Sequence, residues 1–216
     1  MTNEDETRRG RTGGAARERL LQTAYGLFQR NTLNTVGVDR IVAEANVAKT
    51  TLYRHFPSKG DLAVSVLQRH EEVWLTGWLE QVVARSGGPP GARILALFDA
   101  FDDWFRQDDY QGCLFARSLL ETRDPASPVC GAAVAGLADI RAFIRGLAET
   151  AGARDPDVFA LQIQLLLLGS TVAAVSGQLD AARHAQDAAR LLLERDGIPT
   201  TSELPVPADH GPDRVE

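Results

Sequence analysis

The stretch "VDRIVAEANVAKTTLYRHFPSKGDL", residues 38–62, decides how the N-terminal part of the chain folds. Its apolar residues recur at three- and four-residue steps over 38–45, which predicts a short helix. Asn46 interrupts the pattern, and asparagine tolerates the left-handed conformation that a tight corner between helices requires. A second helical pattern covers residues 48–55 and stops before Pro57. The stretch therefore predicts two short helices joined by a corner.

The second of these short helices has little to bury. Its apolar residue is Leu52, with Phe56 directly after it, and a helix of about eight residues is not stable alone in water. The other side chains are hydroxyls, a phenol, an imidazole and cations, which donate hydrogen bonds to phosphate oxygens or contact base edges. Two helices joined in this way have the helix-turn-helix geometry, in which the second helix enters the major groove of DNA.

The charge of the chain is unevenly distributed. The 216 residues carry a net charge of −6, which argues against a general polyanion binder. Residues 1–60 nevertheless hold ten Lys and Arg against six Asp and Glu, whereas residues 61–216 hold thirteen against twenty-three. The basic charge thus lies at the same end as the short helices. Arg8, Arg9 and Arg11 form either a basic arm for the minor groove or an ordinary solvated tail.

Helical periodicity continues to residue 195, and alternating strand patterns are absent from the sequence. We predict an all-α fold with helices over residues 15–29, 38–45, 48–55, 58–84, 92–107, 113–122, 128–150, 157–178 and 180–195, the fourth capped by Ser58. The predicted organisation is a disordered arm (1–14), a three-helix helix-turn-helix DNA-binding domain (15–60), a C-terminal helical effector-binding and dimerisation domain (61–196) and a disordered tail (197–216).

Residues 158–179 form an uncharged run of 22 residues, long enough to span a bilayer. Gln and Ser interrupt the run, and neither an aromatic belt nor a basic flank accompanies it, so a buried helix is the better interpretation. The polar N-terminus lacks the apolar core of a signal peptide, and Cys113 and Cys130 make neither a disulfide framework nor a metal-ligand spacing. We expect a cytoplasmic protein without a membrane span, a cofactor or a metal site.

Aromatic side chains gather in the predicted C-terminal domain. The candidate ligand-binding residues are Trp74, Trp78, Phe98, Phe101 and Phe115. Any one of them is more often plain core, but large apolar pockets between helices are lined in this way, with polar groups such as Gln162, Gln164 or Glu121 to orient the ligand. The predicted ligand is apolar and drug- or lipid-sized.

Small residues recur at four-residue steps in the last two predicted helices. They are Gly169, Ala173, Gly177, Ala181, Ala185 and Ala189. Small residues let helix axes approach closely, so these positions predict tight helix–helix contact. We expect the contact to be a four-helix homodimer interface, and buried packing within one chain is the alternative.

The quoted stretch strongly resembles the DNA-binding region of the tetracycline-repressor (TetR) family, and the resemblance runs from about Arg17 to Leu67. The segment "GCLFARSLLE", residues 112–121, is similar to one found in many members. The resemblance implies a homodimer that binds a double-stranded, palindromic DNA operator through its short helices. It also implies a small apolar effector that binds the all-helical second domain.

The resemblance assigns the DNA contacts residue by residue. The implied residues are Lys49, Thr50, Thr51, Tyr53, Arg54, His55 and Lys59. The first three match positions that read bases or lie near them, Tyr53, His55 and Lys59 match phosphate-binding positions, and Arg54 matches a variable one. Gly37 departs from the Ser or Thr that commonly caps the second helix, and Asn46 departs from the usual glycine of the turn.

We expect a repressor that its ligand releases, although the sequence leaves repression and activation open. A thiol sensor that uses Cys113 or Cys130 is the main alternative. An enzyme is a weaker one, because the sequence has no phosphate loop, nucleophile elbow, dinucleotide fingerprint or HExxH motif.

Overall fold

The computed structural model describes residues 3–122 and 124–201, with the backbone alone for residues 3–13. All regular secondary structure in these residues is helical, which confirms the predicted all-α fold. The elements are α1 (Asn3–Arg30), α2 (Val38–Glu44), α3 (Lys49–His55), α4 (Lys59–His70), the π-helix η1 (Glu71–Leu79), α5 (Glu80–Ser86), α6 (Pro90–Phe105), α7 (Leu114–Glu121), α8 (Pro128–Ala151), α9 (Pro156–Val175) and α10 (Ala181–Asp196).

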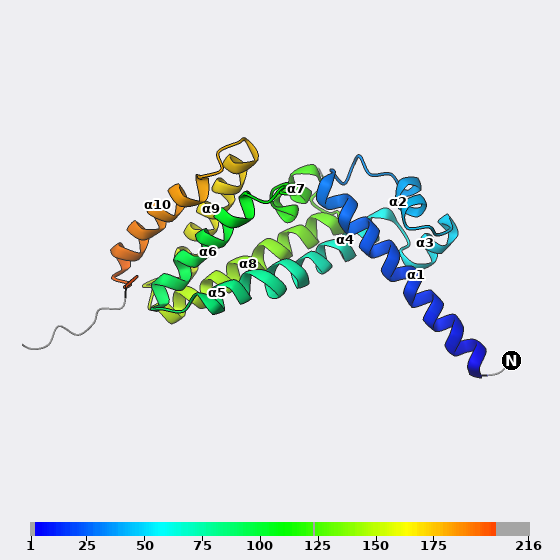
Figure 1. Ribbon diagram of the computed structural model, residues 1–216, viewed down its shortest axis with the longest axis horizontal. Helices are drawn as coiled ribbons and strands as arrows, with labels where there is room; N and C mark the ends of the chain where they lie inside the picture. Colours follow the sequence, from blue (N-terminus) through cyan, green and yellow to red (C-terminus); the bar gives the residue numbers. More distant parts are fainter. Residues whose placement is uncertain (1–2, 123, 202–216) are drawn as a thin grey trace, which may run out of the picture.

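The molecule is elongated, with α2 and α3 near one end and α10 near the other (Figure 1). Helices α4, η1 and α5 follow one another without a break and pass from the small N-terminal unit into the larger C-terminal one. α8 packs against α4, α7 packs against α8, and α9 and α10 pack against each other and against α6. The rod formed by α4, η1 and α5 is therefore the main covalent and packing link between the two ends.

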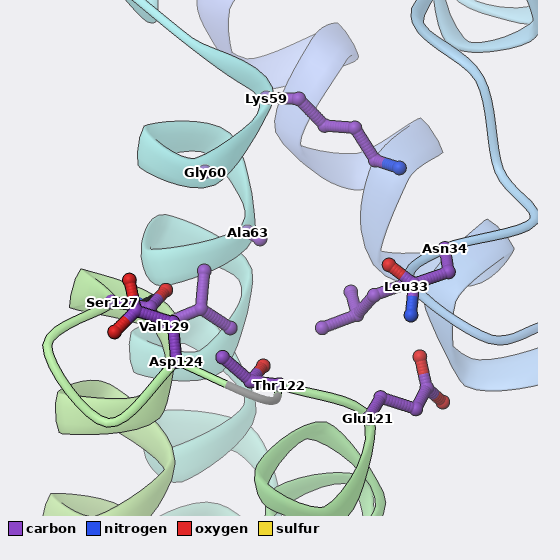
Figure 2. A pocket seen from close by; sticks show the side chains of 10 residues that line it. All are labelled: Leu33, Asn34, Lys59, Gly60, Ala63, Glu121, Thr122, Asp124, Ser127 and Val129. Carbon is purple, nitrogen blue, oxygen red and sulfur yellow. Dashed lines mark hydrogen bonds between the residues drawn. The ribbon is translucent and has the colours of Figure 1, made fainter.

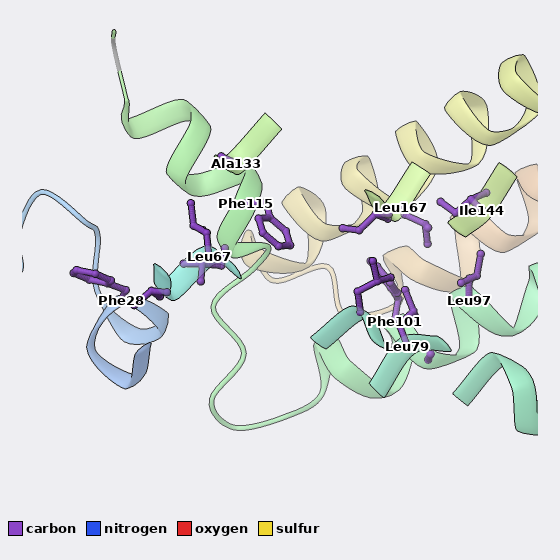
Figure 3. Close-up of a cluster of buried hydrophobic side chains, with 14 of the residues drawn as sticks. Phe28, Leu67, Leu79, Leu97, Phe101, Phe115, Ala133, Ile144 and Leu167 are labelled. Atoms are coloured by element: carbon purple, nitrogen blue, oxygen red, sulfur yellow. The ribbon is translucent and has the colours of Figure 1, made fainter. Parts of the chain in front are cut away.

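One hydrophobic core runs through both units. In the N-terminal unit, α1 buries Leu20, Leu27 and Phe28 at helical spacing, and Ile41 of α2 and Leu52 of α3 close over them. Figure 3 shows buried side chains continuing from Phe28 past Leu67 and Phe115 to Leu167. Leu52 is fully buried, as its position on the short helix predicts, so the core anchors α3 through one side chain.

Both chain ends differ from the prediction. The structure continues α1 to Asn3, so the predicted disordered arm over 1–14 is wrong for residues 3–14, where no proline interrupts the helix. The predicted disordered tail is wrong at its start, because Ile198 is buried and a Cβ on Gly91 would clash with the Pro199 carbonyl oxygen. Residues 1–2 and 202–216, also assigned to the arm and the tail, lie outside the described residues.

The predicted continuous helix over 58–84 contains nine π-helical residues, Glu71–Leu79. A π-helical turn holds more residues than an α-helical turn and is frequent at functional sites. Trp74 and Trp78 both lie in it, with ring centroids 5.3 Å apart. Gly77 suits the segment because a Cβ there would lie 3.1 Å from the Glu72 carbonyl oxygen. Apolar spacing in the sequence does not distinguish this segment from an α-helix.

The long apolar helix α9 has two different faces. By length and composition it could cross a membrane, and 44% of its most apolar window is buried. The buried face holds Phe159, Ile163 and Leu167, in agreement with the interpretation of this run as a packed helix. The other face exposes leucine and valine side chains and is described with the candidate site.

α10 is tied to α6 by an ion-pair network. Asp102 of α6 is buried, and its carboxylate accepts hydrogen bonds from Arg106 at 2.9 Å and from Arg183 at 3.0 Å. Arg106 also donates to Asp180, which directly precedes α10, at 2.7 Å. These hydrogen bonds lower the pKa of Asp102 against the opposing effect of its burial, so the network favours the charged carboxylate.

Candidate functional site

The corner between α2 and α3 is a left-handed helix cap. Asn46 has φ = 51°, and the described residues include no other non-glycine residue at positive φ. Its N–H donates to the Ala43 carbonyl at 3.2 Å, and the Val47 N–H donates to the Val42 carbonyl at 3.1 Å. This pair of bonds is the Schellman motif, which satisfies the last carbonyls of a helix and reverses the chain. The predicted role of Asn46 is confirmed.

The start of α2 also agrees with the sequence. Gly37 is its N-cap, with extended backbone and no side-chain cap bond.

At the start of α4, the Ser58 hydroxyl accepts the Asp61 N–H at 3.1 Å and donates to the Asp61 carboxylate at 2.7 Å. Ser58 is thus the predicted cap, and Asp61 supports it from the third position.

α3 presents polar side chains to solvent. Lys49, Thr50 and Arg54 are exposed, the Tyr53 side chain is 45% exposed, and Thr51 is half-buried. These five residues form one polar surface on a helix anchored by Leu52 alone, and we refer to it as the α3 surface. It carries hydrogen-bond donors suited to phosphates and base edges.

Lys49 is engaged within the chain. Its ammonium nitrogen lies 2.7 Å from an Asp39 carboxylate oxygen of α2, and this contact raises the pKa of Lys49. Both side chains are more than half exposed, so water and salt weaken the pair. Lys49 can therefore exchange Asp39 for another anionic or hydrogen-bonding partner at small cost.

His55 and Lys59, two of the three residues predicted to contact phosphates, are less accessible than the α3 surface. His55 is half-buried, and its Nε2 atom is enclosed with no hydrogen-bond partner among the described residues. Lys59 is half-buried and lies at the wall of a cavity, where burial lowers its pKa against the field of Glu121. The structure therefore groups five of the seven predicted DNA-binding residues on the α3 surface and places His55 and Lys59 behind it.

α7 ties the second domain to the end of α1. The Arg117 guanidinium donates to the carbonyls of Phe28 and Gln29, in the last turn of α1. A cation at this position satisfies free carbonyls and interacts favourably with the helix dipole. Sequence reasoning missed Arg117, because its partners lie almost ninety residues away.

His70, at the end of α4, is buried where α1, α4 and α7 meet. Its Nδ1 atom lies 3.1 Å from the Tyr25 hydroxyl of α1, and its ring lies 5.0 Å from the Phe115 ring of α7. Burial, reinforced by the positive charge of Arg117, lowers the pKa of His70 to about 4. The side chain is therefore neutral at neutral pH.

The aromatic residues of η1 and α6 form a continuous cluster. The Trp74 ring lies 5.7 Å from Phe101 and 5.4 Å from Trp104, and Trp104 lies 4.9 Å from Tyr110. Next to the cluster is an enclosed cavity of about 20 Å³, which is space for about one water molecule. It is lined by Trp74, Phe101, Trp104, Cys113, Leu137, Ile140, Gln164, Leu167, Leu168 and Thr171.

The cavity contains only part of the predicted ligand site. Trp74 and Phe101 line it, Trp78 contacts Trp74 without lining it, and Phe98 and Phe115 are fully buried in the core. A Cβ on Gly136 would clash with the Phe115 ring, which shows how closely this side chain packs on α8. Phe98 and Phe115 are core residues because each fills the space between helices, which helical spacing alone cannot reveal.

Gln164 and Thr171 are polar residues that line this cavity, and both already donate to backbone carbonyls: the Gln164 amide to Leu137 at 2.6 Å and the Thr171 hydroxyl to Leu167 at 2.8 Å. The other two suggested polar groups lie elsewhere: Gln162 contacts Arg195 on the surface, and Glu121 lies at the join near α4. The Trp74 indole N–H is enclosed without an acceptor among the described residues, so it is a donor available to a ligand.

The small residues of α10 pack inside the chain. Ala181, Ala185 and Ala189 are buried, and Ala189 is fully enclosed where α10 meets its neighbouring helices. The expectation that they lie on a dimer surface is therefore corrected in favour of the intramolecular alternative. Gly177 is not in a helix at all: it follows α9 with φ = 99°, a conformation that glycine adopts readily.

The remaining small residues belong to a different surface. Gly169 is exposed, and no atom lies within 4 Å of the position that a Cβ would occupy there, whereas Ala173 is half-buried. Around Gly169 the outer face of α9 exposes large apolar side chains, which we call the α9 face. It consists of Val158, Leu161, Leu165, Val172 and Val175. An apolar stripe of this length is unusual on a free surface.

The helix-turn-helix is the part of the chain that known sequences match best. The family described as "Bacterial regulatory proteins, tetR family" matches residues 20–66, which cover the last part of α1 through the first part of α4. The transcriptional activator FasR of Mycolicibacterium smegmatis is 34% identical over 92 residues, which cover 43% of this chain and 41% of FasR. The HTH-type regulator SAUSA300_2515 of Staphylococcus aureus is 35% identical over 60 residues, 28% of this chain and 32% of that protein. The chain thus spans less than half the length of these curated relatives.

Solved structures extend the similarity along the chain. The protein sav143 from Streptomyces avermitilis superposes with a TM-score of 0.76 at 29% identity, covering 85% of this chain and 99% of that one. The TetR-family regulator SCO4454 from Streptomyces coelicolor gives a TM-score of 0.76 at 27% identity, covering 85% and 96%. The matched helix-turn-helix, the left-handed corner and the fold of the whole helical chain lead to one assignment: residues 20–66 form a helix-turn-helix of the TetR family of bacterial regulatory proteins, and the chain as a whole is similar in fold to solved TetR-family regulators.

Proposed function

We propose that the protein is a cytoplasmic transcriptional regulator that binds a palindromic operator as a homodimer and is released by an apolar small molecule. The single observation that carries the DNA-binding part is the α3 surface, a short helix with five outward polar residues and one anchoring leucine. A solvent-exposed helix of this kind after a tight corner suits the major groove. The relatives FasR and SAUSA300_2515, which are named as transcriptional regulators, support the same proposal.

The dimer part of the proposal rests on the α9 face. One short helix offers few contacts, whereas two copies related by a two-fold axis reach half-sites about 34 Å apart. The α9 face offers an apolar surface that a second copy would cover, with exposed fractions of 60% for Leu165 and 68% for Val172. Gly169 lies between them and would allow two α9 helices to approach closely.

The effector part rests on the aromatic cluster. Its cavity holds about 20 Å³, so an apolar ligand of drug size must separate η1, α6 and α9 to enter. Entry would shift Trp74, which belongs to the rod that begins at Lys59 beside the DNA-reading helices. Coupling then requires that the ligand bind the opened arrangement more tightly than the closed one.

The thiol-sensor alternative is weakened by the environment of Cys113. Burial raises the pKa of the Cys113 thiol, and the thiolate is the reactive form. Cys130 is also buried. Both thiols are therefore more typical of packed residues than of sensors.

DNA selection tests the proposal directly. Purified protein should enrich a two-fold symmetric sequence from random duplexes, and its affinity should fall steeply with salt because Lys and Arg displace phosphate counterions. Tyr53→Phe should weaken binding to all sequences alike, because the phenol donates to a phosphate. Lys49→Ala should instead change the selected bases, since base contacts determine specificity. Recovery of no preferred sequence at moderate salt would reject the proposed function.

A further inference from the structure

Arg17 of α1 lies over the ring of Phe56, the residue that directly follows α3. Its guanidinium carbon is 5.1 Å from the centre of that ring, which is a cation–π contact. Phe56 is buried, and its N–H donates to the Leu52 carbonyl at 2.8 Å, so the ring is fixed to the end of α3. The contact therefore holds a positive charge of α1 at the C-terminal end of α3.

The charge of Arg17 is available to a partner outside the chain. The side chain is exposed, and the positions three and four residues away along α1 are glycine or leucine, which offer no carboxylate. The neighbouring Glu18 is already bound by the Arg69 guanidinium, at 2.9 and 3.0 Å. A guanidinium stacked on a ring keeps the N–H groups at its edge free, and these match the geometry of a phosphate.

The C-terminal end of α3 lacks other accessible phosphate contacts among those that the sequence predicts beyond Tyr53. His55 and Lys59 are both half-buried. Figure 2 shows the Lys59 side chain directed across a cavity, toward the connection that holds Asn34. Arg17 reaches this end of α3 and is exposed, so it can take the place of the two recessed side chains.

The placement of α1 suits the DNA backbone. A recognition helix contacts base edges through its N-terminal residues, here Lys49 and Thr50, while a preceding helix crosses the backbone. α1 packs against both α2 and α3, and Figure 1 shows it continuing beyond them. The two ends of the seven-residue α3 are about 10 Å apart, close to the major-groove width of about 12 Å. With the N-terminal end of α3 over the bases, Arg17 would lie near the phosphates at the edge of the groove.

We propose that Arg17 is a further DNA-binding residue, which contacts a backbone phosphate while the Phe56 ring holds its guanidinium in place. This inference rests on the proposed DNA-binding function and adds a contact from α1. A purely structural role is the alternative, because the side chain covers Phe56 and a cation favours the C-terminal end of a helix. The two roles differ in one measurable respect: only a phosphate contact releases counterions from DNA.

The test is the salt dependence of DNA binding by the full chain, with a mixed-sequence duplex as the probe. Arg17→Met removes the charge but keeps an apolar cover on Phe56, and thermal unfolding checks that the fold is retained. The slope of log K against log salt concentration should become shallower by about 1 for each bound chain. Arg17→Lys, which keeps the charge, should retain most of the slope. The matched control is Arg19→Met, at an exposed arginine two residues along α1 and so on a different face, which should leave the slope nearly unchanged.

A double-mutant cycle tests the role of the ring. Phe56→Leu should weaken DNA binding, and Arg17→Met should then add little, because the guanidinium is no longer held in place. The cycle is measured at a temperature at which thermal unfolding shows every variant to be folded. Additive effects of the two substitutions would contradict the role given to Phe56.

Three outcomes overturn the proposal and leave Arg17 with a structural role. They are an unchanged slope in Arg17→Met, a weaker affinity without a change of slope, and an equal change of slope in Arg19→Met. The mixed-sequence duplex requires no operator, so these results can be read even if DNA selection recovers no preferred sequence and the proposed regulatory function fails. If the unaltered chain bound no duplex at low salt, both proposals would be wrong.

Discussion

At the scale of single residues, Lys49 on the α3 surface is paired with a carboxylate of the neighbouring helix α2. Its ion pair with Asp39 is exposed and contributes little to stability, because solvent screens it. The pair fixes the Lys49 side chain on α3, yet it also places a carboxylate beside the groups that would meet phosphates. Asp39 is therefore a competitor for Lys49 rather than part of the DNA contact.

Asp39→Asn should raise DNA affinity by about threefold to tenfold at low salt, because it frees Lys49 and removes a negative charge from the interface. The measurement is a mobility-shift titration with a selected duplex. The matched control is Glu44→Gln, which removes the same charge from the same helix but breaks the pair with Arg40 instead. An equal gain in both variants would show that net charge, and not the release of Lys49, is responsible.

His70 predicts a dependence of stability on pH. Its pKa falls from 6.5 to about 4 in the folded chain, so the unfolded chain takes up a proton first as the pH falls. The stabilisation is complete above the unfolded pKa and is lost progressively between pH 6.5 and about 4, by on the order of 3 kcal/mol. Tyr25, Trp74, Phe115 and Arg117 face the ring, and none of them offers a negative charge to the imidazolium.

Denaturant unfolding between pH 7 and 4.5 measures this effect. His70→Gln should remove most of the slope, and its amide can still pair with the Tyr25 hydroxyl. His184→Gln is the control, because His184 is exposed on α10. If the His70 variant kept the slope of the unaltered chain, other groups would account for the acid sensitivity.

At the scale of elements, the packing of α7 on α8 depends on a missing side chain. A Cβ on Gly136 would clash with the Phe115 ring, and that ring is buried, with 1% of its surface exposed, so it cannot turn aside into solvent. Gly136→Ala should therefore destabilise the protein by about 1–3 kcal/mol despite the higher helix propensity of alanine. Thermal unfolding followed by circular dichroism is the measurement.

Gly146 provides the control on the same helix. A Cβ there meets no atom within 4 Å, so Gly146→Ala should be neutral or stabilise by up to about 1 kcal/mol. Destabilisation of equal size in both variants would place the effect in the backbone of α8 and not in its contact with Phe115.

The sequence predicts elements better than it predicts their surroundings. The corner at Asn46, the Ser58 cap and the polar outer side of α3 follow from local chemistry, and each is found as expected. The π-helix at Glu71–Leu79 could not be predicted, because apolar spacing does not record one extra residue per turn. The alanines of α10 were wrongly predicted to lie at a dimer interface for a related reason. A small residue permits two helices to approach closely, but it does not determine whether the partner helix belongs to the same chain.

The candidate sites follow the same division. Of the predicted ligand-binding residues, Trp74 and Phe101 line a cavity, whereas Phe98 and Phe115 fill the core, and the spacing of the aromatic residues does not distinguish the two cases. Lys59 and Glu121, sixty-two positions later, line one cavity, and no local pattern links them. Contacts between distant segments are set by tertiary packing, so this cavity appears only in three dimensions.

At the scale of the whole molecule, two cavities lie along the same rod. The cavity beside Lys59 is lined by the first turns of α4, and the aromatic cavity is lined by Trp74 of η1, further along that rod. Arg117 adds a second link from α7 to the end of α1. A ligand at either cavity can therefore alter how the α3 surface is oriented, and coupling of this kind is typically worth about 1–3 kcal/mol.

The orientation of α3 matters only if two copies are held together, and the α9 face is where we expect that contact. Gly169→Arg should convert the dimer to a monomer, because it places a long cation in the middle of an apolar contact. The substitution should leave each chain folded, since Gly169 is exposed and its Cβ position is empty.

Val73→Arg, at a residue 51% exposed on η1, is the control for adding a cation to an apolar surface position. Sedimentation equilibrium would measure the mass and circular dichroism the fold. A folded Gly169→Arg variant that remained a dimer would move the interface away from α9, whereas a folded monomer with weakened operator binding would tie dimerisation to DNA recognition.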